Sequence, residues 1–354
     1  MKTFTKFTFV TCLVVLQAMA FAQFSKIAVS HNGATTFYTN LNSAVTSALD
    51  GDTIYLPGGS INTTGEVLID KKLTIVGAGH YPDSTTATYQ TYIVQSIRIA
   101  TGADGGSLSG IKCGSIYFGS DASNQSVNPY IIQRCNIDNL ILSNWGVSAS
   151  QFLIKENVIN GLVSPYSAGS IVFENNIFNQ NTFYVFSAIY NNNIFYFIGG
   201  LNYSPFYFPP LSNSVLNNNI FVVTTSSYPY LGIVIGSQGC VFNNNIFCGN
   251  TSFFIGDWGN NLNNYNLSTL LSADTFINAT TDVFSYSNDY HLKPGSPGIN
   301  YGTDGHDVGL YGSDTPYKEG AVPFNPHIIS KNIGSSLSNS GNISIDIKVS
   351  AQDR

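Results

Sequence analysis

Ionisable side chains that could perform acid–base chemistry gather in one short part of this sequence. Lysine or arginine can neutralise an anionic group or remove a proton, and glutamate can act as the complementary acid or base. The four candidates for such a role are Arg134, Lys155, Glu156 and Glu174. No lysine or arginine occurs from Glu156 to Leu292. Ordinary cross-strand ion pairs, worth about 0.2–1 kcal/mol each, would use the same residues, and we favour that interpretation.

A second group of ligand-type residues lies near the carboxyl end of the chain. Asp304, His306 and Asp307 are close together in the sequence. Carboxylate oxygens are ligands that calcium prefers, so these residues are the candidate metal site. A polar turn explains the same residues, and we favour the turn. We therefore expect no cofactor, with calcium as the alternative.

The candidates must be positioned by the framework of the chain, and that framework is a repeat. A six-residue phrase has an apolar first and sixth position, and its middle is Asn or a small or polar residue. Its copies begin at Leu108, Ile132, Ile154, Phe173, Tyr190, Leu216 and Phe242. The spacing is therefore 24, 22, 19, 17, 26 and 26 residues. Such a period indicates a solenoid, whose units bury their apolar faces only by stacking on their neighbours.

The fourth position of this repeat predicts a ladder of side-chain amides. Asparagine suits a bend between two strands because it tolerates the left-handed region and bonds its own backbone. The last five copies have asparagine at the fourth position, namely Asn157, Asn176, Asn193, Asn219 and Asn245. Stacked at strand spacing, about 4.8 Å, these amides would lie directly above one another.

Short strands at this period, with no helical periodicity, favour a right-handed parallel β-helix. The Asn-Asn-x-Phe phrase, as in 244–247, together with the asparagine ladder resembles the pectin-lyase-like proteins, whose fold is a right-handed parallel β-helix. The resemblance covers nearly the whole chain after its leader. It implies an all-β solenoid with an amphipathic helix over its first coil. We expect that N-terminal capping helix near 41–49, with Asn40 as its N-cap and Leu41, Ala44, Val45, Ala48 and Leu49 on one face.

The same resemblance raises the question of polysaccharide cleavage, because the family includes lyases and glycosidases. A lyase needs a cation and a base, which the stretch after Glu156 lacks. A glycosidase needs two carboxylates about 5 Å or about 6.5–9.5 Å apart. Glu156 and Glu174 stand at different positions of adjacent repeats, and the Asp-Asp and Gly-His-Gly phrases of polygalacturonases are missing. We therefore expect a protein without catalysis, with a polysaccharide lyase or glycoside hydrolase as the alternative.

The start of the chain predicts export. Lys2 and Lys6 precede an apolar run, and small residues lead to a cleavage site after Ala22. We therefore expect a signal peptide at 1–22, a β-helix domain with its cap at 23–320 and a C-terminal extension at 321–354. The phrases at 289–300 and 307–312 resemble the closing coil of secreted β-helix proteins, and the alternation at 343–349 predicts a terminal strand or hairpin. The expected location is extracellular, either released or at the cell surface.

The cysteines are compatible with an exported chain, but their positions do not show whether any two of them form a disulfide. Cys240 and Cys248 flank one copy of the repeat, so they could pair if the bend brings them together. Cys113 and Cys135 stand at different positions of successive copies and are expected to fill the core. No cysteine or histidine spacing indicates zinc.

Charge and aromatic content point to the expected partner. Without the two leader lysines, 12 basic residues face 20 acidic ones, a formal charge of −8. That balance argues against nucleic acid. Two insertions between strands carry Tyr203, Phe206, Tyr207, Phe208, Tyr228 and Tyr230, which would share one surface. Aromatic faces stack on sugar rings, so we expect the protein to bind a neutral polysaccharide or a cell-surface glycan. We also expect a monomer with no transmembrane segment. A purely structural or adhesive role is the other interpretation.

Overall fold

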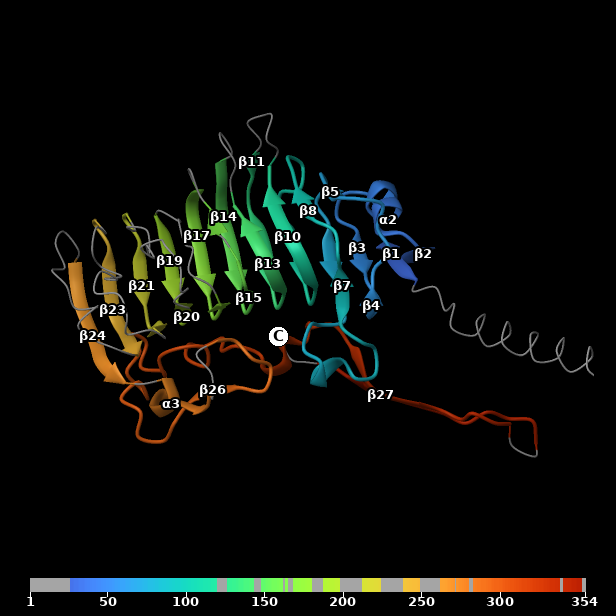
Figure 1. Cartoon of the computed structure of the whole chain (residues 1–354). Helices are drawn as coiled ribbons and strands as arrows, with labels where there is room; N and C mark the ends of the chain where they lie inside the picture. The colour runs from blue at the N-terminus through green and yellow to red at the C-terminus, as the bar shows by residue number, and fades with distance from the viewer. Residues whose placement is uncertain are drawn as a thin grey trace, which may run out of the picture.

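The structure is a computed structural model (Figure 1). It describes residues 26–119, 126–142, 148–161, 163–164, 168–179, 187–197, 212–223, 238–248, 262–270, 272–279, 283–337 and 340–351. The expected signal peptide at 1–22 lies outside these residues. So do all six aromatic residues of the two insertions.

The described chain is an almost entirely β protein in which successive coils stack as a parallel β-helix (Figure 1). Its first row of strands contains β3 (Thr53–Tyr55), β6 (Thr74–Val76), β9 (Gly106–Ser109), β12 (Tyr130–Gln133), β14 (Ser148–Lys155), β17 (Ala168–Glu174), β19 (Ala188–Asn191), β21 (Val215–Asn217) and the start of β23 (Val241–Cys248). The second row contains β4 (Gly59–Ser60), β7 (Thr91–Ile93), β10 (Lys112–Phe118), β13 (Asn136–Ile141), β15 (Val158–Ile159), β18 (Ile177–Phe178), β20 (Ile194–Phe197), β22 (Ile220–Val223) and the end of β23. The predicted solenoid is therefore confirmed.

The remaining elements complete the coils and their two ends. A further side of the first coils contains β5 (Val67–Ile69), β8 (Ile97–Ile99) and β16 (Val163–Ser164), which extend along the far ends of β10 and β13. The start of β14 pairs with β11 (Ser126–Val127), and β23 pairs with β24 (Leu262–Leu270). The amino end contains β1 (Ile27–His31), β2 (Ala34–Tyr38) and α2 (Leu41–Ser47). After β24 come α3 (Ser272–Thr275), β25 (Phe276–Asn278), β26 (Asp289–Leu292), β27 (His327–Ile333) and β28 (Ile345–Ser350), with short 3-10 turns η1 (Asp83–Thr85) and η3 (Glu319–Ala321).

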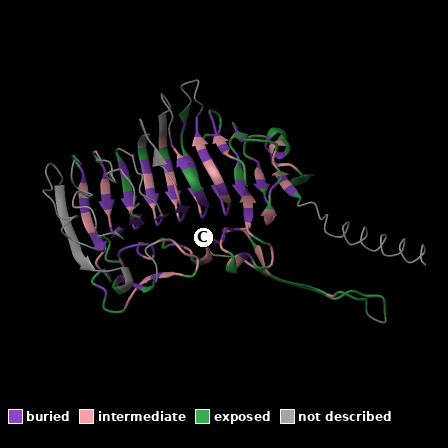
Figure 2. Cartoon of the chain, in the orientation of Figure 1, coloured by how far each residue is buried: buried purple, intermediate pink, exposed green. Residues whose placement is uncertain are grey.

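Strand register confirms the repeat position by position. Each first-position residue pairs with the next in the series Leu108, Ile132, Ile154, Phe173, Tyr190, Leu216 and Phe242. The series continues backward from Leu108 to Ile75 and Ile54, two coils that the sequence phrase did not identify. Sixth-position aromatic rings stack inside the coil, with centroids of Phe195 and Phe221 4.8 Å apart. The first- and sixth-position side chains therefore belong to the main core. Figure 2 shows in purple that many residues of the stacked strands are buried.

The predicted asparagine ladder is present and completely buried. Asn157, Asn176, Asn193, Asn219 and Asn245 are each 0% exposed. Every ladder oxygen accepts the backbone N–H of the fourth-position residue in the preceding coil, at 2.9–3.0 Å. Each side-chain amide in turn donates to a first-position carbonyl, as Asn193 Nδ2 does to Phe173 O at 3.0 Å. The ladder thus supplies partners for polar backbone groups at a bend that regular strand pairing cannot serve.

The left-handed residue of the bend is the third position of the repeat. Gly110, Arg134, Glu156, Asn175, Asn192, Asn218 and Asn244 have φ angles between +52° and +67°. Asparagine and glycine tolerate this region readily, whereas arginine and glutamate do so at a cost. The bend here turns the third-position side chains outward, where they contact the C-terminal part of the protein.

The capping helix is confirmed at the amino end of the solenoid (Figure 1). Asn40 caps α2 by accepting the Ser43 N–H at 3.1 Å, and Leu41, Ala44 and Val45 are buried in the main core. The expectation for Leu49 is wrong, because the helix ends before it and its side chain is 56% exposed. Ala48 adopts an extended conformation at the C-cap and ends the helix.

All four described cysteines are buried, and none of them forms a disulfide. Cys240 and Cys248 therefore do not form the disulfide that the sequence left open. Cys248 Sγ lies 3.2 Å from Thr275 Oγ1, and Cys240 Sγ lies 3.6 Å from the Gln238 carbonyl. Cys113 and Cys135 fill the core, as expected.

Residues 283–324, hereafter the strap, lie along the outside of the solenoid (Figure 1). The prediction of a closing coil at 289–300 and 307–312 is wrong, because these residues lie against the outer face of the solenoid. The strap runs back toward the amino end, since Tyr301 contacts Asn244, Gly309 contacts Asn218 and Val322 contacts Arg134. It covers the outward-facing fifth-position side chains, which form a second hydrophobic core with it: Val158, Ile177, Ile194, Ile220 and Ile246. Near its end the strap packs Pro323 against Gly110. Glycine is needed there, because a Cβ on residue 110 would lie 2.2 Å from Pro323 Cγ.

The predicted terminal hairpin is confirmed as the antiparallel pair β27–β28, which projects from the body (Figures 1 and 2). Its apolar side chains face solvent: Ile333, Leu337, Ile343, Ile345, Ile347 and Val349 are 47–68% exposed. An isolated two-stranded hairpin is only marginally stable in water. Among the described residues, no helix is long and apolar enough to cross a membrane.

Limited trypsin digestion is expected to cut this hairpin first. Lys331 and Lys348 are exposed on its two strands, so cleavage there requires only local opening. Lys71 is the internal control, since its Nζ donates to three carbonyls at the end of α2 at 2.8–3.2 Å. Mass spectrometry of timed samples should show a body that ends at Lys331. Cleavage after Lys71 at the same rate would contradict this difference in local stability.

Candidate binding pocket

The four acid–base candidates of the sequence come together as an ion-pair cluster on the outside of the bend. Arg134 Nε donates to Glu156 Oε2 at 2.8 Å, and the two side chains are only 4% and 3% exposed. Lys155 Nζ lies 3.9 Å from Glu156 Oε1. Lys155 is directly opposite Glu174 in the strand register, as the repeat predicted. The predicted stacking of opposite charges is therefore confirmed for these residues.

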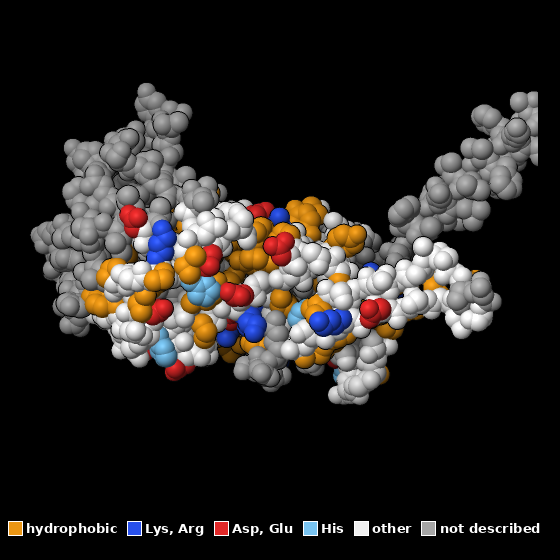
Figure 3. Space-filling view, turned by 90° about the horizontal axis from the view of Figure 1, so that it is seen from below, with side chains coloured by type: hydrophobic (Ala, Val, Ile, Leu, Met, Phe, Trp, Pro, Cys, Tyr) orange, Lys and Arg blue, Asp and Glu red, His pale blue; other side chains and the backbone are white. Residues whose placement is uncertain are grey.

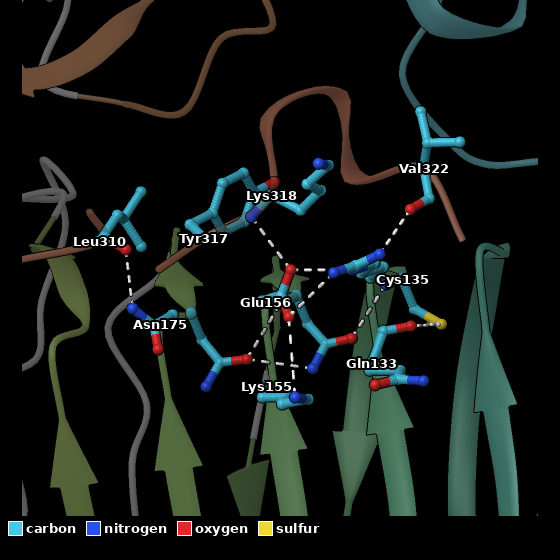
Figure 4. A network of polar contacts seen from close by, with 12 residues as sticks. Gln133, Cys135, Lys155, Glu156, Asn175, Leu310, Tyr317, Lys318 and Val322 are labelled. Atoms are coloured by element: carbon cyan, nitrogen blue, oxygen red, sulfur yellow. Dashed lines mark hydrogen bonds and ion pairs between the residues drawn. The ribbon is translucent and has the colours of Figure 1, made fainter. Parts of the chain in front are cut away.

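The strap covers this cluster and uses its remaining polar atoms (Figure 4). The backbone N–H of Lys318 donates to Glu156 Oε2 at 3.0 Å, and Arg134 Nη1 donates to the Val322 carbonyl at 2.6 Å. The Arg134 guanidinium also lies 3.9 Å from the centroid of the Phe324 ring. A substrate would have to displace the strap to reach the buried ion pair. The cluster can fasten the strap to the solenoid.

Glu174 and Lys155 lie at the edge of the same contact. Thr315 Oγ1 donates to Glu174 Oε1 at 3.1 Å, which adds a further link between strap and coil. Neither residue lines either of the two pockets described below. The geometry therefore brings all four candidates together, but along the strap contact rather than in a cavity.

The candidate metal ligands form the polar turn that we favoured. Asp304 Oδ1 accepts the His306 N–H at 3.1 Å, and Asp307 Oδ1 accepts the Asn300 N–H at 2.8 Å. His306 Nε2 lies 3.1 Å from Asp314 Oδ1, away from the other two carboxylates. Within the described ranges, no group of three histidine, cysteine, aspartate or glutamate residues could hold a metal ion.

A pocket of about 420 Å³ lies between the strap and the loop that begins at His80. Its lining is Tyr81, Asp83, Ser84, Tyr286, Asn288, Asp289, Tyr290, Tyr311, Tyr317, Glu319 and Gly320. Two segments about 200 residues apart in the sequence thus form its walls. Figure 3 views the molecule from below, from the side of the strap, where acidic and histidine side chains lie among hydrophobic ones. We call this the tyrosine pocket.

The tyrosine rings of this pocket are held by edge contacts and hydroxyl hydrogen bonds. Tyr81 meets Tyr286 edge to face at 4.8 Å, and Tyr317 donates its hydroxyl to that of Tyr81 at 3.1 Å. Asn136 on β13 donates to the Tyr286 hydroxyl at 2.7 Å, which ties the pocket to the solenoid. Burial raises the pKa of Tyr286 to about 12 despite the hydrogen bond from Asn136, so its hydroxyl remains neutral. The rings are therefore preorganised and uncharged.

Carboxylates supply the charge of the pocket. Asp289 Oδ1 lies 2.7 Å from His291 Nδ1 and also accepts the His291 N–H at 3.0 Å. Burial acts to raise the pKa of Asp289, but the hydrogen bonds and the charge of His291 outweigh it and lower this pKa below its usual value. The His291 ring stacks on Tyr311 with centroids 3.6 Å apart, and its Nε2 lies 3.9 Å from Glu319 Oε1.

A second pocket, of about 440 Å³, lies on the other side of the same loop. Its lining includes Thr85, Tyr89, Tyr92 and Lys112, so it is neutral to basic where the tyrosine pocket is acidic. Tyr89 is 72% exposed there. This pocket lacks the concentration of fixed rings and carboxylates found under the strap.

Sequence reasoning missed the tyrosine pocket, although one pattern pointed to it. Residues 283–324 contain five tyrosines, at 286, 290, 301, 311 and 317, around the two phrases at 289–300 and 307–312 that resemble a closing coil. Pockets that bind organic ligands are typically lined by aromatic side chains with a few polar groups. The tyrosine rings, the amide and the carboxylates of this cavity fit that description. Comparison of the chain with protein-family models and with curated protein sequences finds no match.

Proposed function

We propose that this protein binds a glycan, without cleaving it, in the tyrosine pocket. The observation that carries this proposal is a preorganised set of five tyrosine rings beside carboxylates and an amide in one cavity. Tyrosine presents an apolar ring face to the C–H groups of a sugar, and its hydroxyl bonds with little loss of entropy. Carboxylate and amide oxygens accept hydrogen bonds from sugar hydroxyls, with good geometry where they are fixed in place.

The proposal includes the extracellular location and the pectin-lyase-like family that the sequence predicts. A pectin-lyase-like β-helix exported by a cleaved leader would present the pocket to extracellular polysaccharides. Its role would be retention of a polymer or attachment to a cell surface. The elongated solenoid would act as a rigid support for the strap and the loop at 80–90.

Cleavage is less consistent with the geometry than binding. A glycosidase keeps one carboxyl group protonated in an apolar environment while a second stays ionised. In the tyrosine pocket the pKa of Asp289 is lowered, which is unsuited to a general acid. Glu319 is 76% exposed and lies at the rim. Arg134 and Glu156 are covered by the strap.

Tyr311→Ala is expected to weaken glycan binding at least about tenfold. The variant removes a ring face fixed by its stack on His291. Stacking of a nucleobase on an aromatic side chain is worth about 1–3 kcal/mol, and we expect a loss of that order for a sugar ring packed on Tyr311. Tyr311→Phe keeps the ring and should retain most of the affinity. Calorimetric titration with a panel of soluble neutral oligosaccharides, with product analysis of the same mixtures, measures both binding and cleavage.

Tyr89→Ala is the matched control, because it removes an exposed tyrosine from the other side of the same loop. It should bind as the unmodified protein does. Equal binding by Tyr311→Ala would instead move the site to the aromatic insertions at 203–230, which stay a sequence prediction. New reducing ends in the mixtures would show that the protein cleaves the glycan, and they would contradict binding without catalysis. Melting curves of each variant confirm that it is folded.

A further inference from the structure

We propose that the tyrosine pocket selects a sugar unit carrying a free, protonated amine. This inference rests on the proposed glycan binding and specifies its ligand class. The lining contains three carboxylates, Asp83, Asp289 and Glu319, and no lysine or arginine among the residues that the structure describes. A neutral sugar leaves that negative charge uncompensated, whereas an ammonium group neutralises part of it.

Two of the three carboxylates, Asp83 and Glu319, make no hydrogen bond within the described ranges. Glu319 Oε1 lies 3.9 Å from His291 Nε2, which is beyond hydrogen-bonding distance and is an ion pair only when that ring is protonated. Asp83 has no ion pair within the described ranges and is exposed at the start of η1. Asp289 differs because it is occupied by His291. Asp83 from the loop and Glu319 from the strap both line the pocket with exposed carboxylates and remain available to a ligand.

The tyrosine rings favour the same ligand. A cation within about 6 Å of a ring centroid is attracted to the ring face, and surrounding rings form the cage by which proteins recognise organic ammonium groups. Tyr81, Tyr286 and Tyr311 line the same pocket as the two available carboxylates. A bare metal ion fits this lining less well, since calcium requires six to eight oxygen ligands and no three-residue ligand group is found among the described residues. An amine attached to a sugar ring satisfies the carboxylates and places its ring against the tyrosines.

The test compares two oligosaccharides that differ only in the amine. Glucosamine hexamer and its fully N-acetylated counterpart are titrated into the purified protein at 50 mM salt, with a glucose hexamer as the neutral reference. We expect the amine form to bind at least about tenfold more tightly than the acetylated form, which corresponds to about 1.4 kcal/mol. The preference should shrink at 500 mM salt, because screening weakens pairing at a partly exposed rim.

Asp83→Asn combined with Glu319→Gln should reduce the ratio of the two affinities to near one. Asp314→Asn is the matched control, because it removes a carboxylate of the same strap that is 97% exposed and lies outside the pocket lining. That variant should keep the full ratio. An equal loss of preference in the control would show general attraction to an acidic protein and would overturn the inference.

The outcomes separate this inference from the proposed function. Equal affinity for the amine and acetylated forms, with both bound, overturns amine selection and leaves glycan binding standing. Binding of none of the three hexamers, together with no binding in the neutral panel, overturns both. Tighter binding of the amine form that is lost in the double variant supports both.

Discussion

Asn193→Ala, in the middle of the asparagine ladder, is expected to destabilise the protein by about 3–5 kcal/mol. The side chain accepts the Asn176 N–H at 2.9 Å and donates to Phe173 O at 3.0 Å. It also bonds Asn176 and Asn219 within the ladder. Truncation leaves a buried N–H and a buried carbonyl without partners, and each such orphan costs about 1–3 kcal/mol.

Asn191→Ala is the matched control for the ladder. Asn191 stands two residues earlier in the same coil, at the second position of the repeat, and accepts a bond from Asn217 at 3.2 Å. Its side chain is half-buried on the outer surface, so water can replace the lost bond, and the expected cost is below about 1 kcal/mol. Urea unfolding followed by circular dichroism gives both values. Similar small losses for the two variants would show that the ladder bonds contribute no more than surface amides.

Glu156→Ala is expected to cost about 3–5 kcal/mol and to loosen the strap. The substitution leaves the Arg134 guanidinium buried without a counter-charge, which is the situation in which removing one partner of an ion pair is most destabilising. It also removes the acceptor of the Lys318 N–H. The double variant Arg134→Met with Glu156→Gln should lose less than the sum of the single losses, because no uncompensated charge remains.

Glu66→Ala provides the comparison on the same solenoid. Glu66 Oε1 accepts from Arg98 Nε at 2.7 Å, but the two side chains are 38% and 21% exposed. Solvent screens this pair, so its loss should cost less than about 1 kcal/mol. Urea unfolding measures stability, and timed proteolysis of the strap between 283 and 324 reports its release. If Glu156→Ala behaves as Glu66→Ala does, the buried pair does not fasten the strap.

Local periodicity explains why the framework of this protein could be predicted. Apolar first and sixth positions, separated by a polar bend, determine which side chains enter the coil, and the register from Leu108 to Phe242 follows from them. Asn40 and the apolar spacing after it predicted the capping helix for the same reason. The fourth-position asparagines predicted the ladder, because identical residues at identical positions of stacked coils must meet.

The same periodicity misled the prediction where a contact came from outside the coil. Fifth-position residues such as Ile194 and Ile220 would face solvent in a bare solenoid, and their apolar character had no explanation in the repeat. Arg134 and Glu156 occupy third positions where Asn or Gly suits the left-handed backbone better. Both departures are explained by the strap, which buries the isoleucines and is fastened by the ion pair.

The sequence by itself determined the coil, the ladder, the cap and the terminal hairpin, because each depends on residues at regular or short spacing. Only the tertiary structure decided that residues 283–324 return along the solenoid instead of closing it. That return places Tyr311 and Glu319 in one pocket with Tyr81 and Asp83, residues that no repeat or motif connects. A pocket assembled from such distant segments depends on the direction in which the chain runs between them. The spacing of residues in the sequence does not determine that direction.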